Sequence, residues 1–133
     1  MQEYRAGGDA LAKDEAEAAS LEERFNRALN KSIVETITAV LGRDVAAATS
    51  YHLYAYLGLS TEDIPNHLKE FFNALTGSFG DGGPVLGRII VRRLYVELGL
   101  TFVQKPNGSL VEYVEDAKRM FLNGEKVRSK RQT

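Results

Sequence analysis

The chain has 133 residues, of which 44% are hydrophobic and 26% charged, and these proportions are typical of a single globular domain. No segment approaches the roughly 18 consecutive apolar residues of a membrane-spanning helix. The absence of cysteine excludes disulfides, thiolate nucleophiles and cysteine-based metal sites. Composition therefore favours a protein of a reducing compartment, and we expect a cytoplasmic location.

The net charge of −1 is unevenly distributed along the chain. Residues 1–24 carry seven acidic and three basic side chains, residues 25–104 are balanced, and residues 105–133 carry seven basic and four acidic side chains. Solvated termini explain this asymmetry best, and a contact between chains or a nucleic-acid-binding tail are the alternatives. We divide the chain into an acidic extension (1–20), one helical domain (21–124) and a basic tail (125–133).

The first part of the chain predicts two helical segments. Residues 9–20 are rich in Ala and Glu, which favour a helix, but Leu11 is their only large apolar residue. After them, an apolar residue recurs at every fourth position, which predicts a helix that ends before Gly42. The residues of this stripe are Leu21, Phe25, Leu29, Ile33, Ile37 and Leu41.

The segment 45–57 contains no charged residue and is apolar on nearly every face. Asp44 is placed to cap its start, and Gly58 is placed to end it. An uncharged helix of this kind is typical of the centre of a bundle, where neighbours surround it. We therefore expect 45–57 to be buried and to expose no reactive centre.

Two further helices each begin at a proline. The first starts at Ile64-Pro65, carries a stripe of phenylalanine and leucine, and ends in the glycine-rich stretch 77–83. The second covers 84–98 and has two apolar sides separated by narrow polar strips. We expect this second helix to be sandwiched in the core, with its three arginines reaching solvent between its neighbours.

The last helix is predicted by a capping box. Ser109 and Glu112 have the spacing at which each side chain bonds the other residue's backbone amide, and apolar residues at helical spacing follow as far as Asn123-Gly124. A β-hairpin of 100–104 and 110–114 is the competing interpretation. The prediction is an all-α, compact bundle of about five helices preceded by the acidic helix, and the alternative is a helical domain with a small, winged-helix-like hairpin.

Residues that could support chemistry are few. His52 and His67 have no spacing typical of a metal site, and no catalytic combination can be assembled, so we expect no enzyme, cofactor or metal. The glycines of 77–84 are explained by turns better than by phosphate binding. A small-molecule sensor is an alternative, with a pocket walled by Tyr51, His52, Phe72 and Phe79.

Nucleic-acid binding is a second alternative. Arg88 and Arg92 lie one turn apart on a predicted helix, and the basic tail adds four more cations. The neutral body of the chain lacks the clustered positive charge that phosphate binding requires. The basic residues of the tail are Lys126, Arg128, Lys130 and Arg131.

The order of turn and packing motifs resembles a family of small archaeal all-helical output domains from thaumarchaeal signalling proteins. The motifs are Leu41-Gly42, Leu57-Gly58-Leu59, Asp63-Ile64-Pro65, Phe71-Phe72 with Leu75, Phe79-Gly80, Ile89-Ile90 with Leu94, and the start of the last helix from Ser109 to Val114. The likeness covers residues 25–121. It implies an all-α regulatory or signal-output module, and it assigns no catalytic or ligand-binding residue.

These observations favour a non-catalytic regulatory or protein-interaction module that self-associates, as a homodimer, through helix contacts. The surface we expect to pair is the acidic helix 9–20 with the start of the 21–41 helix, since a lone helix with one large apolar residue gains little by folding back on its own chain. A protein partner is the alternative, and no membrane contact is expected.

Overall fold

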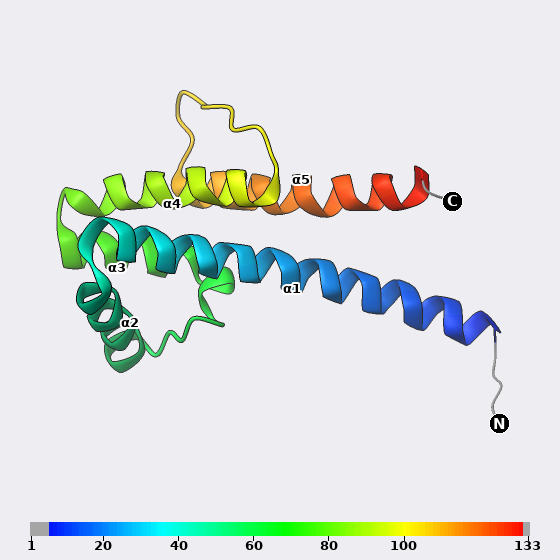
Figure 1. The fold of residues 1–133 in the computed structure, drawn as a ribbon, viewed down its shortest axis with the longest axis horizontal. Coiled ribbons are helices and arrows are strands. Elements are labelled where there is room, and N and C mark those ends of the chain that lie inside the picture. The colour runs from blue at the N-terminus through cyan, green and yellow to red at the C-terminus, as the bar shows by residue number, and fades with distance from the viewer. Residues whose placement is uncertain (1–5, 132–133) are drawn as a thin grey trace.

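The computed structural model describes the backbone of residues 6–131 and the side chains of residues 20–124, and it consists of helices joined by short loops. Figure 1 shows α1 as a long helix that crosses the molecule, with α4 and α5 along one side of it and α2 standing at one end. The elements are α1 (Ala6–Leu41), α2 (Arg43–Leu57), the 3₁₀ turn η1 (Ile64–Asn66), α3 (Leu68–Phe79), α4 (Gly82–Leu98) and α5 (Leu110–Arg131).

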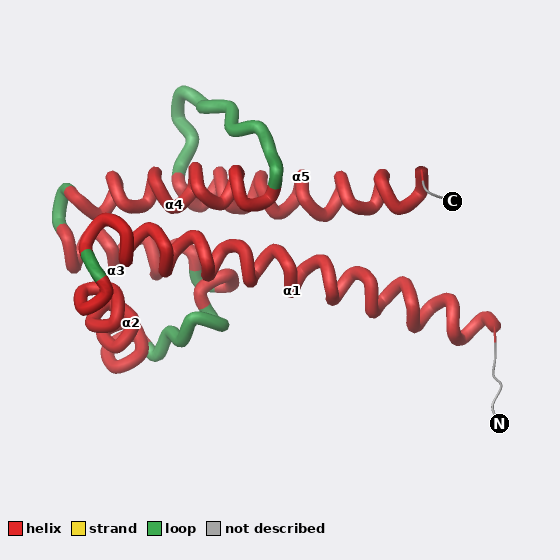
Figure 2. Tube along the Cα trace, in the orientation of Figure 1, coloured by secondary structure: helices red, strands yellow, loops and turns green. Residues whose placement is uncertain are grey.

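The all-α prediction is confirmed, because the described residues contain no strand (Figure 2). The segment 100–109 is a loop, so the hairpin alternative is wrong. The reason is the predicted capping box: the Ser109 amide donates to Glu112 Oε1 at 2.8 Å, and the Glu112 amide donates to Ser109 Oγ at 3.1 Å. These two bonds satisfy free amides at the helix start and so favour α5 over a second strand.

The acidic segment and the 21–41 stripe form one continuous helix, α1, of 36 residues. Phe25, Leu29, Ile33 and Ile37 of the stripe are all buried. The helix ends as predicted at Gly42, whose φ of +96° is readily adopted by glycine and whose amide donates to Thr38 O at 2.9 Å. Beyond the bundle, the first part of α1 and the last part of α5 extend towards the same end of the molecule (Figure 1).

Helix α4 is central, as predicted, because it packs against α1, α3 and α5. One side of it, with Ile90, Val91 and Leu94, is fully buried. The prediction of a second buried side is wrong, since Val85 is 46% exposed and Val96 is 79% exposed. The bundle has no further helix to cover that side of α4 among the described elements.

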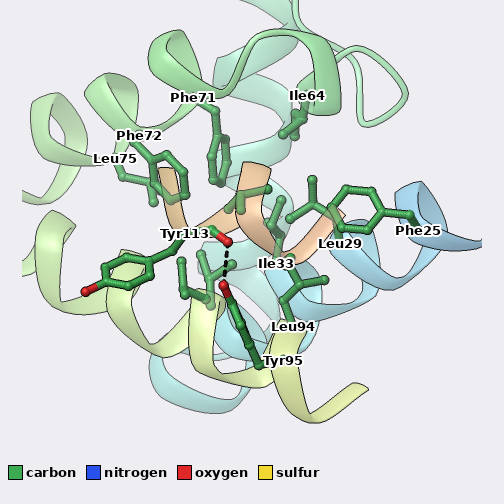
Figure 3. Packing of buried hydrophobic residues seen from close by; sticks show 14 of the residues in the cluster. Phe25, Leu29, Ile33, Ile64, Phe71, Phe72, Leu75, Leu94, Tyr95 and Tyr113 are labelled. Atoms are coloured by element: carbon green, nitrogen blue, oxygen red, sulfur yellow. Dashed lines mark hydrogen bonds between the residues drawn. The ribbon is translucent and has the colours of Figure 1, made fainter. Parts of the chain in front are cut away.

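The core lies where α1, α3, α4 and α5 meet (Figure 3). Phe71 and Leu75 of α3 and Leu94 of α4 are at most 1% exposed. The Tyr95 hydroxyl, drawn in Figure 3, donates to the backbone carbonyl of Tyr113 at 2.8 Å and links α4 to α5 inside this core. Burial raises the pKa of Tyr95, so its hydroxyl stays protonated and able to donate.

The prediction that 45–57 lies at the centre is wrong. Helix α2 stands on the outside of the bundle with α1 as its main neighbour, and only Thr49 and Leu53 of it are buried. Its other uncharged residues are mostly alanines and tyrosines. Alanine has little apolar area to bury and the tyrosine hydroxyl prefers water, so the lack of charge did not require burial.

Several predicted boundaries also shift. Helix α2 begins at Arg43 after Gly42, and Asp44 makes no capping bond. The helix predicted from Ile64 is split, because His67 leaves helical geometry (φ −137°, ψ 47°) between η1 and α3. Helix α4 begins at Gly82 instead of Pro84, and α5 continues past Asn123-Gly124 to Arg131, so much of the predicted tail is helical.

Candidate interaction surface

The most unusual surface of the described chain is the outer side of α2. Tyr51, Tyr54 and Tyr56 are 70%, 65% and 74% exposed. Helix α2 is held to α1 by a narrow stripe, in which Thr49 and Leu53 are buried and Ala46 is half-buried. Three aromatic side chains on one short helix therefore face solvent, where large apolar groups usually indicate a binding surface.

We define the α2 face as five exposed residues on the side of the helix away from this buried stripe, where Asp44 of the first turn also lies. A turn of roughly 100° per residue places Tyr51 almost opposite the stripe, with the others on both sides of it. All five side chains are exposed. The α2 face consists of Ala47, Ala48, Tyr51, Tyr54 and Ala55.

Electrostatics sets this surface apart from the rest of the molecule. Between Asp44 and Glu62 the chain carries no formal charge. Arg43 and Asp44, adjacent in the first turn of α2, offset each other in net charge. Tyrosine combines a large apolar ring with a hydroxyl that tolerates water, and it is enriched at the energetic centre of protein interfaces. The α2 face thus fits an uncharged, partly apolar partner better than a charged one.

The predicted pocket residues do not line one cavity. His52 and Phe79 border a wide, shallow hollow of about 380 Å³ between α2 and the end of α3. Phe72 lies in the core, 8% exposed, with its ring 5.2 Å from that of Phe71. Tyr51 points to solvent on the α2 face, while His52 packs on Tyr56 at a ring separation of 4.6 Å. Only two of the four residues predicted for the pocket, His52 and Phe79, therefore border the same hollow.

Only two of the six residues predicted for nucleic-acid binding have side chains that the structure describes. Arg88 and Arg92 are exposed on α4, and the Arg92 guanidinium lies 4.7 Å from the centre of the Phe102 ring. Exposed Val85 and Val96 share this side of α4, so the surface alternates cations with apolar groups. Lys126, Arg128, Lys130 and Arg131 belong to the last turns of α5, where side chains lie outside the described residues.

Titratable groups form small structural pairs. Within the described side chains, no group of three or more His, Cys, Asp or Glu residues is arranged to hold a metal ion. Asp63 accepts hydrogen bonds from the amide and hydroxyl of Ser60, and the backbone bond lowers the pKa of its carboxyl most. His67 Nδ1 lies 3.9 Å from Glu70 Oε1 on the surface. These contacts fix the loop that leads into α3.

Sequence reasoning missed the α2 face, although a signal for it was present. Between its two ends, α2 has one large aliphatic residue, Leu53. The stripe of α1, in contrast, has a large apolar residue at every fourth position. One leucine, with Thr49 one turn and Ala46 two turns before it, can bury only one narrow side of the helix. The tyrosines then have to lie outside it.

Comparison of the chain with protein-family models, with curated proteins and with solved structures gives no match. Among the described residues, no helix is long and apolar enough to cross a bilayer. The functional argument therefore depends on the surface that the fold presents.

Proposed function

We propose that this protein is a non-catalytic helical interaction module that self-associates through exposed helix surfaces. The observation that carries the proposal is the α2 face, where two tyrosines are at least 65% exposed on a helix without a charge from Val45 to Leu57. Burying such a surface removes apolar area from water, and the charges nearest to it, Arg43 and Asp44, stand at its end in the first turn of α2. The low desolvation cost favours association over permanent exposure.

The acidic segment 9–20 is a weaker candidate for the same role. Leu11 is its only large apolar residue, and its four acidic side chains would repel the same segment of a second copy. The structure also shows that this segment continues α1, so it does not need a partner to complete a separate short helix. The α2 face is therefore the surface through which we propose that the module binds.

The proposal is tested by the mass of the protein in solution. Sedimentation velocity over a concentration range of about 1–300 μM, typical of interfaces of modest area, should show the monomer converting to a species of twice its mass. A monomer that persists throughout this range would contradict self-association. Self-association that continues to large, indefinite species would contradict a closed dimer.

Nucleic-acid binding is a second candidate function, because Arg88 and Arg92 lie one turn apart and both side chains are exposed. A gel-shift experiment with duplex DNA tests it at two salt concentrations. Binding that falls steeply between about 50 and 200 mM salt would support phosphate contacts, since released counterions drive them. Absence of a shift at the lower salt concentration would exclude this function.

A further inference from the structure

We propose that the outer side of α4 binds an amphipathic helix of a partner protein whose carboxylates pair with Arg88 and Arg92. This surface lies on a different helix from the α2 face, so the inference goes beyond self-association. It depends on the spacing of exposed residues along α4, on two arginines without an ion pair, and on the room that the neighbouring elements leave.

The outer side of α4 has the residue spacing of a helix that pairs with another helix. Four residues separated by four, three and four positions lie along one line of this side, as in the contact line of a coiled coil. Val85 and Val96 are 46% and 79% exposed, and Ile89 is half-buried and lies outside the core cluster. We call this line the α4 seam, and it consists of Val85, Ile89, Arg92 and Val96.

Two arginines on this side of α4 lack an acidic partner. Arg93 pairs with Glu35 of α1 at 3.6 Å, whereas Arg88 and Arg92 form no ion pair with any side chain that the structure describes. The contact of Arg92 with the Phe102 ring holds the guanidinium in place but uses none of its N–H groups as hydrogen-bond donors. Carboxylates match the paired N–H groups of a guanidinium, so the seam fits a helix that provides them.

Charge and apolar area together decide between the possible partners. A second copy of α4 would bring its own arginines against Arg88 and Arg92, and like charges in contact weaken an interface. The acidic segment 9–20 of another copy has carboxylates, but Leu11 is its only large apolar residue. The phosphates of DNA would match the arginines and leave the aliphatic residues of the seam without an apolar partner. An acidic amphipathic helix provides for both.

Neighbouring elements leave this side of α4 open. The helix packs into the bundle through its other side. In Figure 1 the loop 100–109 and α1 lie on opposite sides of α4. Arg92 contacts Phe102 of the loop, and Arg93 contacts Glu35 of α1, so both elements border the seam. A partner helix can therefore lie along α4 between them without displacing an element of the bundle.

The first experiment uses a synthetic peptide as the partner. The peptide has three heptads with leucine at positions a and d, glutamate at e and g, and glutamine elsewhere, and its matched control has lysine for every glutamate. The seam extends over about three turns, so the full chain should bind the acidic peptide with a micromolar dissociation constant. The basic peptide should bind about tenfold more weakly or worse at about 0.1 M salt. Fluorescence anisotropy of the labelled peptides measures both.

The second experiment locates the contact with variants of the chain. Arg92→Glu should weaken binding of the acidic peptide about tenfold or more and strengthen binding of the basic peptide, because it reverses the charge at the seam. Val96→Gln should weaken binding of the acidic peptide severalfold, because it removes an apolar contact without a change of charge. Lys69→Glu is the matched control, since it makes the same change of charge at an exposed position of α3 and should leave both dissociation constants unchanged.

Each result has a definite consequence. Equal binding of the two peptides would overturn the inference, as would binding of the acidic peptide that Arg92→Glu or Val96→Gln leaves unchanged while the variant keeps its helical circular dichroism. A chain that binds neither peptide but binds duplex DNA, and loses that binding with Arg92→Glu, would also overturn it in favour of the nucleic-acid function. A chain that stays monomeric and binds the acidic peptide through the seam would overturn the proposed self-association and leave this inference standing.

Discussion

Single residues decide how closely the helices of this bundle approach one another. Gly83, in the first turn of α4, is buried against α3, and a Cβ atom added there would lie 2.6 Å from the Thr76 Cα atom. Gly77 in α3 has open space around it. Gly77 lies near the end of α3 and Gly83 near the start of α4, but only Gly83 is required by packing.

Gly83→Ala should therefore lower the free energy of unfolding by about 1–3 kcal/mol, because backbone atoms cannot move aside as a flexible side chain can. Gly77→Ala is the matched control and should raise this free energy by about 0.5–1 kcal/mol, since alanine is the better helix former. Urea unfolding followed by circular dichroism measures both changes. Equal effects of the two substitutions would contradict the close contact between α3 and α4.

Buried hydroxyl groups on α1 and α2 differ in their hydrogen bonding. Thr36 is completely buried, and its Oγ1 atom has no partner among the described residues. Thr49, at 9% exposure, donates from Oγ1 to the Val45 carbonyl at 2.8 Å. Burial of the Thr36 hydroxyl costs free energy, because it loses its hydrogen bonds to water and gains none. The Thr49 hydroxyl replaces such a bond with the one to the Val45 carbonyl.

Thr36→Val should consequently raise the free energy of unfolding by about 0.5–2 kcal/mol, because a methyl group replaces an unpaired hydroxyl of similar size. Thr49→Val, which removes a made hydrogen bond, should be neutral or destabilising. Thermal and urea unfolding of the two variants provide the comparison. A loss of stability in Thr36→Val would show that its hydroxyl has a bonding role.

At the scale of elements, a carboxylate joins the loop 100–109 to α5. Asp116 forms ion pairs with Lys105 of the loop and with Arg119 one turn along α5. The hydrogen bond from Lys105 is the largest of the effects that lower the pKa of Asp116 below its usual value near 3.8. The ionised form of Asp116 is thus favoured in the folded protein.

This shift has a definite sign for stability. A carboxyl with a lowered pKa in the folded state contributes stability that is complete above its unfolded pKa and is lost as the pH falls through the folded pKa. Asp116→Asn should therefore be less stable than the native protein at pH 7. The difference should shrink as the pH falls below about 4, as measured by urea unfolding at each pH. A difference that does not depend on pH would contradict the ion pair as its cause.

The same scale explains why α4 is central and the uncharged segment 45–57 of α2 is not. Helix α4 has aliphatic residues at the positions that face three neighbours, and Gly87 admits Leu110 and Phe72 to its surface. Helix α2 has Leu53 and little else of comparable size towards α1. Burial follows the apolar area that a helix offers, and the absence of charge alone is a poor guide to it.

For the whole molecule, the charge asymmetry and the uncharged α2 face predict opposite responses to salt. The acidic start of α1 and the basic end of α5 extend from the same end of the bundle, while α2 stands at the other end (Figure 1). A dimer held by charge would weaken as salt screens it. A dimer held by tyrosine and alanine would not, because apolar burial does not depend on ionic attraction.

We therefore expect the dissociation constant of the dimer to change less than about twofold between 0.05 and 1 M sodium chloride, whereas screening of charged contacts should raise it far more. Removal of residues 1–19 should leave the stoichiometry of the dimer unchanged. Light scattering of both proteins at both salt concentrations provides the measurement. A deletion variant that becomes monomeric would restore the acidic segment as the interface.

The sequence by itself determined the helical class, most helix ends and the start of α5, because each depends on local interactions. The four-residue stripe of α1, Gly42 with its positive φ, and the bonds between Ser109 and Glu112 all act within a few residues of one another. Only the tertiary structure decided which sides of α2 and α4 are covered. Val96 and Tyr51 are exposed because no neighbouring helix covers them, and the number and position of neighbours depend on contacts between distant parts of the chain.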